Sequence, residues 1–102
     1  MISIKPGARI RGLRPEAWAA VDIAYSLFRD AGVADLMVTE GTGGQHKPGS
    51  RHYVGLAVDI GIRDVGALAP TLRSKIADAL GADYDVVLEA THIHIEHDPK
   101  EK

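Results

Sequence analysis

Two stretches of this chain hold residues whose types and spacing could bind a metal ion. Residues 50–60 carry His52 and Asp59, and the run His92-Ile93-His94 follows near the C-terminal end. Histidine nitrogens and aspartate oxygens are common zinc ligands, and the chain has no cysteine to supply a thiolate. Two imidazoles and one carboxylate leave a fourth tetrahedral position for water, which is typical of catalytic zinc, whereas structural sites are closed by four protein ligands. We therefore predict a site for one Zn²⁺ per chain.

The residues around Asp59 predict a strand with an open polar face. Large side chains at positions 54, 56, 58 and 60 alternate with small ones, so the large set should face a core. Asp59 then stands between Ala57 and Gly61, which leave room above it. His52 precedes the regular strand, and the entering loop can fold it over Asp59.

The second stretch repeats the period of two. His92, His94 and Glu96 share one face of a strand, and the two isoleucines between them share the other. If this strand pairs with the strand of Asp59 with the polar faces aligned, His52 and Asp59 converge with one of the two histidines. The spacing thus predicts one shared site.

The combined motif resembles a known family signature. Ser50-x-His52-x-x-Gly55-x-Ala57-x-Asp59 with a later His-x-His is similar to the zinc D-alanyl-D-alanine carboxypeptidases and dipeptidases. That family includes phage endolysins that cut L-alanyl-D-glutamate bonds, and it shares its site with the hedgehog signalling domain. The resemblance covers residues 38–97 and implies a zinc peptidase that cuts a D-Ala-D-Ala or L-Ala-D-amino-acid bond in the stem peptide of peptidoglycan.

The resemblance also implies roles for single residues. It makes His52, Asp59 and one later histidine the zinc ligands, and Glu89 the general base. In many of the peptidases the base lies three residues before the zinc histidine, which points to His92, whereas in the hedgehog domain the second histidine of the pair binds metal, which points to His94. Residues two apart on a strand are separated by about 6.6 Å, so a three-ligand site takes only one directly. We expect His94 as the ligand and His92 as a catalytic helper that stabilises the oxyanion.

Two other carboxylates are weaker candidates for the base, Asp85 and Glu96. Glu96 shares the face of His94 and could instead orient its imidazole as an outer carboxylate partner.

The stretch before His52 is predicted to bind substrate. Residues 40–49 contain four glycines and a proline, which predicts a loop, and His46 falls where the hedgehog domain has a histidine near its zinc. Ser50 matches a family serine that contacts the substrate backbone, although it could equally cap the turn. Carboxypeptidase-type relatives place an arginine ahead of the motif to hold a substrate carboxylate, and residues 38–41 offer none. Arg51 is nearby but in a different position, so we assign it to substrate binding and slightly favour an endopeptidase.

Composition limits the class of protein. The 102 residues are 45% hydrophobic and 25% charged with a net charge of −2, which is ordinary for a globular domain. No basic patch suggests a nucleic-acid partner, and no apolar run suggests a membrane span or a cleaved leader. We expect a monomer made in the cytoplasm that reaches the cell wall through phage-mediated release or delivery.

Periodicity predicts a single α+β domain over residues 1–102. Apolar residues at three- and four-residue steps predict helices after Pro15 and near Pro70, and short strands are predicted at 36–39, 85–88 and 92–96. The order of these elements indicates a mainly antiparallel sheet with two helices, the architecture that the resemblance also implies. Residues 1–14 are predicted as an extended lead-in and residues 98–102 as a frayed tail.

Two other interpretations compete with a peptidase. One is a catalytically silent zinc-binding interaction module, such as a hedgehog-like pseudo-peptidase or a component of a phage particle. The presence of Glu89 favours activity, because a silent module has no need of the base. The other is a closed structural metal site in which His46 joins His52, Asp59 and His94.

Overall fold

Two α-helices form where apolar residues recur at three- and four-residue steps. In the computed structural model, which describes residues 1–43 and 50–99, α1 spans Pro15–Asp30 and α2 spans Ala69–Leu80. Each helix has a proline in its first turn, where the missing N–H breaks no hydrogen bond. Gly81 ends α2 with a φ of +82°, a conformation that favours glycine.

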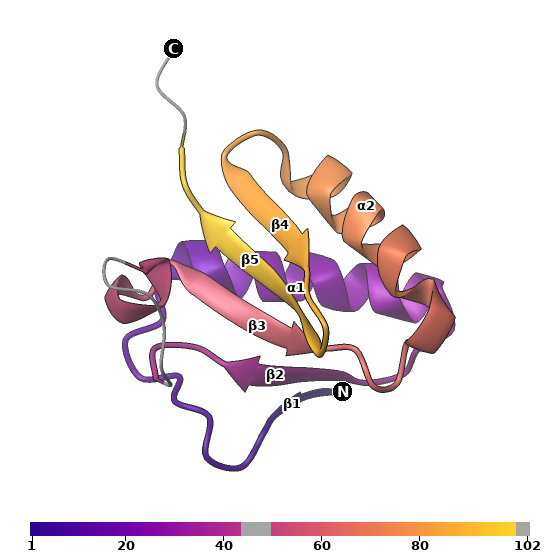
Figure 1. Cartoon of the computed structure of the whole chain (residues 1–102), viewed down its shortest axis with the longest axis horizontal. Helices are drawn as coiled ribbons and strands as arrows, with labels where there is room; N and C mark the ends of the chain where they lie inside the picture. Colours follow the sequence, from indigo (N-terminus) through magenta and orange to yellow (C-terminus); the bar gives the residue numbers. More distant parts are fainter. Residues whose placement is uncertain (44–49, 100–102) are drawn as a thin grey trace.

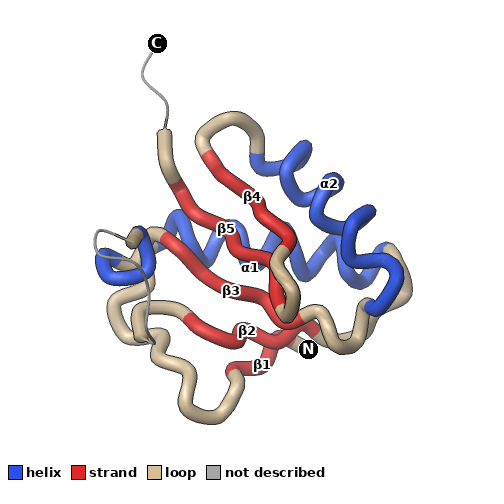
Figure 2. Tube along the Cα trace, in the orientation of Figure 1, coloured by secondary structure: helices blue, strands red, loops and turns tan. Residues whose placement is uncertain are grey.

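Five strands form one sheet in the order β1-β2-β3-β5-β4 (Figure 2). All neighbouring strands pair antiparallel except β1 and β2, which run parallel. Two helices and a mainly antiparallel sheet confirm the predicted α+β fold. The strands are β1 (Ile2–Ile4), β2 (Leu36–Glu40), β3 (Ala57–Gly61), β4 (Tyr84–Leu88) and β5 (His92–His97).

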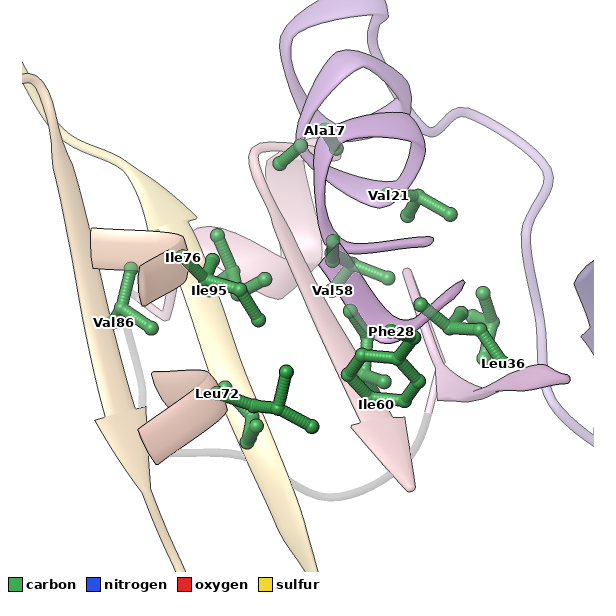
Figure 3. Packing of buried hydrophobic residues seen from close by; sticks show 14 of the residues in the cluster. Ala17, Val21, Phe28, Leu36, Val58, Ile60, Leu72, Ile76, Val86 and Ile95 are labelled. Carbon is green, nitrogen blue, oxygen red and sulfur yellow. The ribbon is translucent and has the colours of Figure 1, made fainter. Parts of the chain in front are cut away.

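The core lies between the sheet and the two helices. Figure 1 shows α1 crossing behind the sheet and α2 lying beside β4. Close-packed aliphatic side chains and Phe28 fill this layer, with Leu72 and Ile76 of α2 beside Ile95 of β5 (Figure 3). Burying one such large side chain fully contributes about 1.5–3 kcal/mol to folding, so this face holds the strands in register.

Alternation along the strands leaves the opposite face of the sheet polar. Val58 and Ile60 of β3 are buried in the core, so Asp59 between them points the other way. On β5 the buried residues are Ile93 and Ile95, and the histidines alternate with them. Neither α1 nor α2 covers this open face (Figure 1).

The strand predicted over residues 54–60 begins later than expected. Val54 ends a 3-10 helical turn, η1 (Arg51–Val54), and is 49% exposed, and β3 starts only at Ala57. The later start results from a long-range contact, because the segment before α1 packs against residues 54 and 55. Arg14 donates its backbone N–H to Gly55 O and its Nε–H to Val54 O, at 2.9 and 2.8 Å. These bonds hold the residues before β3 out of the sheet.

Both ends of the described chain are more ordered than predicted. The lead-in contains β1, whose Ile2 and Ile4 pack against the core beside β2. Asp98, placed in the frayed tail by sequence, donates its backbone N–H to Asp83 O at 2.8 Å and pairs with Arg51. Residues 100–102 lie outside the described chain.

Candidate metal centre

Strand pairing places Asp59 beside His94. β3 and β5 run antiparallel, and Asp59 is the register partner of His94. Directly opposed residues of an antiparallel pair have Cβ atoms about 4.5–5.5 Å apart on one face, so both side chains reach one point above the sheet. Asp59 is 7% exposed, and its neighbours on this face, Ala57 and Gly61, leave room for the two side chains to meet.

His52 reaches the same point from η1. Ser50 caps this turn, because its Oγ accepts a hydrogen bond from the backbone N–H of His52 at 3.2 Å. Gly55 ends the turn with a φ of +78°, and a Cβ there would clash with the carbonyl oxygen of Gly12. The turn is therefore fixed between Ser50 and the segment before α1, and His52 is only 2% exposed.

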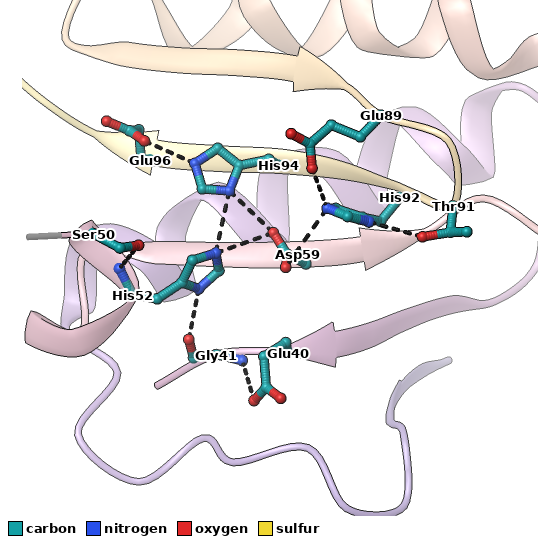
Figure 4. A network of polar contacts seen from close by, with 10 residues as sticks. All are labelled: Glu40, Gly41, Ser50, His52, Asp59, Glu89, Thr91, His92, His94 and Glu96. Carbon is teal, nitrogen blue, oxygen red and sulfur yellow. Dashed lines mark hydrogen bonds and ion pairs between the residues drawn. The ribbon is translucent and has the colours of Figure 1, made fainter. Parts of the chain in front are cut away.

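The ligand atoms of His52, Asp59 and His94 form a nearly equilateral triangle (Figure 4). His52 Nε2 lies 3.2 Å from Asp59 Oδ1, and His94 Nδ1 lies 3.1 Å from the same oxygen. The two ring nitrogens are 3.2 Å apart. Three ligand atoms this close, on side chains that are mostly buried, make a group that could hold a metal ion.

Hydrogen bonds on the far side of each ring orient the two imidazoles. His52 Nδ1 lies 2.7 Å from Gly41 O, and a carbonyl can only accept, so Nδ1 carries a proton and Nε2 faces Asp59. His94 Nε2 donates to Glu96 Oε1 at 2.7 Å, so His94 Nδ1 faces the same point. Metal-binding histidines typically donate their other ring N–H to a carbonyl or a carboxylate, as both rings do here.

Glu40 holds the carbonyl that orients His52. Its Oε1 accepts the backbone N–H of Gly41 and that of Arg9, both at 3.0 Å. A Cβ on Gly41 would lie 2.6 Å from Arg9 O and 3.0 Å from Leu13 Cδ1, so only glycine fits. Sequence reasoning missed both Glu40 and Gly41, because a backbone carbonyl partner leaves no mark on side-chain type.

Asp59 and His94 shift each other's pKa values. Burial alone would raise the pKa of Asp59, but the imidazoles of His52 and His94 outweigh it and hold that pKa far below the ordinary value. The hydrogen bond to Asp59 raises the pKa of His94 to about 9 despite burial, and Glu96 adds to the effect. In the metal-free protein a proton on His94 Nδ1 thus links the three residues at neutral pH. A bound cation would take the place of that proton.

The side chains of Glu89 and His92 are bonded to each other at the edge of the centre. Glu89 Oε2 accepts from His92 Nε2 at 2.5 Å, and Thr91 Oγ1 lies 3.0 Å from His92 Nδ1. His92 Nε2 is 3.7 Å from Asp59 Oδ2, so His92 lies next to the three-residue group and outside it. The side chain of Glu89 is 50% exposed and is therefore accessible to a bound molecule.

Of the three residues predicted to bind substrate, Ser50 and Arg51 contact other residues of the protein. Ser50 has the capping role that was the alternative to substrate contact. The Arg51 guanidinium pairs with Asp98 at 2.5 Å, which ties η1 to the residue after β5. His46 lies outside the described residues, and so do its predicted contact with substrate and the closed four-ligand site that would include it.

A second group of acidic residues lies beside the centre. The carboxylates of Asp85, Glu96 and Asp98 come within 4.8 Å of one another. Glu96 is bound to His94 and Asp98 to Arg51, so these two carboxylates belong to the ion-pair network that surrounds the centre.

The chain matches no family model, and comparisons with curated proteins and with solved structures find no match. Among the described residues, no helix combines the length and the apolar character that a membrane span requires.

Proposed function

We propose that this chain is a zinc-dependent peptidase that hydrolyses a peptide bond in the stem peptide of peptidoglycan. The observation that carries the proposal is the position of Glu89 and His92, which are bonded to each other beside the group of three predicted ligands, His52, Asp59 and His94. A metal site alone would suit many roles, but a half-exposed carboxylate that is held next to it suits hydrolysis.

The spacing of the ligand atoms suits zinc. Tetrahedral bonds of about 2.0–2.1 Å place ligand atoms about 3.3 Å apart, close to the 3.1–3.2 Å edges of the triangle. Two imidazoles and a carboxylate with no thiolate are also a ligand set that zinc accepts well. When bound, zinc would polarise a peptide carbonyl and lower the pKa of nearby water.

The chain's own residues would manage the protons. Peptide hydrolysis needs a group that takes a proton from the attacking water and returns one to the leaving amine. Glu89 Oε2 is accessible for both steps and already accepts a proton donor, His92 Nε2–H. Once Glu89 has taken the proton of the water, His92 Nε2–H would donate to the oxygen that becomes negative in place of Glu89, while Thr91 fixes the His92 ring.

The substrate class rests on the resemblance of residues 50–59 and 92–94 to the D-alanyl-D-alanine peptidase signature. Neither a D-Ala-D-Ala bond nor an L-Ala-D-amino-acid bond is favoured by the geometry of the centre. Cleavage of stem peptides would take place after the protein reaches the cell wall, for example on phage-mediated release.

Digestion of purified peptidoglycan and defined muropeptides tests this proposal. We expect the zinc-loaded wild type to release a defined fragment by mass spectrometry, Glu89→Ala to bind zinc equally and release none, and Asp78→Ala, an exposed acid on α2, to behave as wild type. If the wild type holds one zinc ion tightly and cleaves nothing, the peptidase proposal fails and the alternative stands, a silent zinc-binding interaction module. Equal cleavage by Glu89→Ala would remove Glu89 from the role of base.

A further inference from the structure

Segment 9–14, which precedes α1, contacts the chain on both sides of η1. Before this turn, Thr42 donates its backbone N–H to Arg9 O at 2.8 Å. After it, Arg14 donates its backbone N–H to Gly55 O at 2.9 Å. The segment therefore holds both flanks of the turn that carries the first of the predicted metal ligands.

One peptide group connects segment 9–14 to His52. The carbonyl of Gly41 and the N–H of Thr42 belong to the same planar group and point in opposite directions. The carbonyl accepts from His52 Nδ1 at 2.7 Å (Figure 4), and the N–H donates to Arg9 O on the other side. Hydrogen bonds in a chain polarise and strengthen one another, so the bond to Arg9 strengthens the bond that orients His52.

Glu40 fixes the neighbouring peptide group. Its Oε1 accepts the backbone N–H of Gly41 and that of Arg9, both at 3.0 Å, so one carboxylate oxygen joins the two parts of the chain. Hydrogen bonds to an ionised acceptor are roughly twice as strong as bonds between neutral groups. The Glu40 carboxylate is turned away from the three predicted ligands (Figure 4), so its contribution is to hold the backbone.

Two glycines allow segment 9–14 to lie this close to η1. A Cβ on Gly41 would lie 2.6 Å from Arg9 O. A Cβ on Gly55 would clash with Gly12 O. A side chain at either position would therefore push the segment away from the turn.

Few apolar contacts hold segment 9–14 in place. Leu13 is 9% exposed and Ile10 packs partly against the core, whereas the other residues of the segment are exposed. Segments with little buried apolar area open locally at a low cost in free energy. The hydrogen bonds to the flanks of η1 therefore decide much of whether the segment stays docked.

We propose that Glu40 is a positioning residue that couples zinc binding to the docking of segment 9–14. With the segment docked, the Gly41 carbonyl holds the His52 ring in its ligand orientation. With the segment displaced, the ring loses that orientation and zinc affinity falls. Coupling is reciprocal, so zinc favours docking by the factor by which docking favours zinc. The inference rests on the zinc centre of the proposed function and gives it a means of regulation, because displacement of the segment weakens metal binding.

Amide hydrogen exchange measured by NMR tests the coupling from the side of the segment. We expect zinc to slow the exchange of the Arg9, Thr42 and Arg14 amides at least about fivefold, the lower end of typical coupling between sites. The control is the exposed amide of Gly32, which donates to Arg29 O in the turn after α1 and should exchange equally fast with and without zinc. Unchanged exchange of the first three amides on zinc loading would overturn the proposal.

Substitutions of Glu40 test the coupling from the side of the metal. Glu40→Ala removes the acceptor of both N–H groups and should reduce zinc affinity about tenfold in competition with a chromogenic chelator, the lower end for outer partners of a ligand. Glu40→Gln keeps an accepting oxygen and removes the charge, so its loss of affinity should be smaller. Equal losses in the two variants would overturn the proposal, because the effect would then come from the negative charge alone.

Two further variants act on the segment itself. Thr42→Val keeps the shape of the side chain and removes its 2.7 Å hydrogen bond to Arg11 O, so zinc affinity should fall several-fold. Arg9→Ala keeps the backbone N–H and carbonyl that make the contacts, so this matched control should bind zinc as the wild type does. If Thr42→Val binds zinc as tightly as the wild type, docking of the segment does not support the centre and the proposal is overturned.

Failure of this coupling can be told apart from failure of the peptidase. The measurements follow zinc binding and amide exchange and need no turnover. Coupled binding with no cleavage of peptidoglycan would support the positioning role of Glu40 and contradict the peptidase. Cleavage of peptidoglycan by a protein whose zinc binding and segment docking are independent would do the opposite.

Discussion

On β5, Ile93 and Ile95 are buried under the helices, whereas His92 and His94 alternate with them on the open face of the same strand. One face supplies apolar area to the core, and the other supplies ligands and charges. The two faces are coupled, because a shift of the strand by one residue would expose the isoleucines and bury the histidines. The core therefore keeps the histidines in position, although none of its side chains belongs to the metal group.

The two faces differ in what holds their residues in place. The apolar face is stabilised by packing and burial, which are not directional. The polar face depends on directed contacts of 2.7–3.2 Å between Gly41, His52, Asp59, His94 and Glu96. Substitutions on the first face should therefore change stability, and substitutions on the second should change metal binding.

The largest expected effect is that of His94→Ala on zinc affinity. Loss of an outer hydrogen-bond partner typically reduces metal affinity roughly 10–100-fold, and loss of a ligand should cost more than that. Competition with a chromogenic chelator measures the affinity. Val87→Ala is the control, since Val87 is the exposed register partner of His94 on β4. Zinc affinity close to that of the wild type would show that His94 is not a ligand.

The next effect is that of Ile95→Ala on the free energy of unfolding. Ile95 is 1% exposed, and truncation of a buried isoleucine leaves a cavity that costs about 2–5 kcal/mol. Urea denaturation of the metal-free protein measures this cost. The folded fraction should still bind zinc, because the ligands belong to the other face. A decrease in the free energy of unfolding of less than about 1 kcal/mol would contradict the assignment of stability to the apolar face.

A smaller effect is expected for Glu96→Gln. The amide keeps the size of the side chain but weakens the charge-assisted bond to His94 Nε2, so zinc affinity should fall roughly 10–100-fold. The unfolding free energy of the zinc-loaded protein should fall in step with its affinity. Asp78→Asn, on the exposed side of α2, serves as the matched control. An unchanged affinity would mean that Glu96 does not orient the ring.

The smallest effect is the pH dependence of the metal-free protein. The pKa of His94 is raised from 6.5 to about 9, so its stabilising contribution is complete below pH 6.5 and is lost as pH rises through 9. The pKa of Asp59 is lowered, so its contribution is present above pH 3.8 and is lost as pH falls further. Thermal unfolding with a chelator present should therefore give the highest Tm between these limits. The decrease in Tm towards pH 9 should be smaller in His94→Ala than in the wild type. An equal decrease would show that His94 is not the group whose titration lowers the stability.

Much of the fold could be predicted from local periodicity. The steps of three and four residues in α1 and α2 and the period of two in β5 follow from side-chain geometry, and the structure confirms them. The start of β3 was predicted wrongly, because Arg14 binds the carbonyls of Val54 and Gly55 and the sequence pattern contains no record of that contact. β1 was missed for a similar reason, since three residues are too few for a pattern and their pairing with β2 is long-range.

The amino-acid pattern alone shows which residues could meet. Asp59 shares a face of β3 with the small residues Ala57 and Gly61, and His92 and His94 share one face of β5. The aliphatic residues that alternate with them point those faces away from the core. The pattern could not determine which histidine joins Asp59. A shift of β5 by two residues would keep every side chain on its face and would place His92 opposite Asp59 in place of His94. The choice between the two histidines comes from the register of β3 and β5, which pairs Asp59 with His94 and Gly61 with His92. The short turn after β4 and the packing of Ile93 and Ile95 set that register.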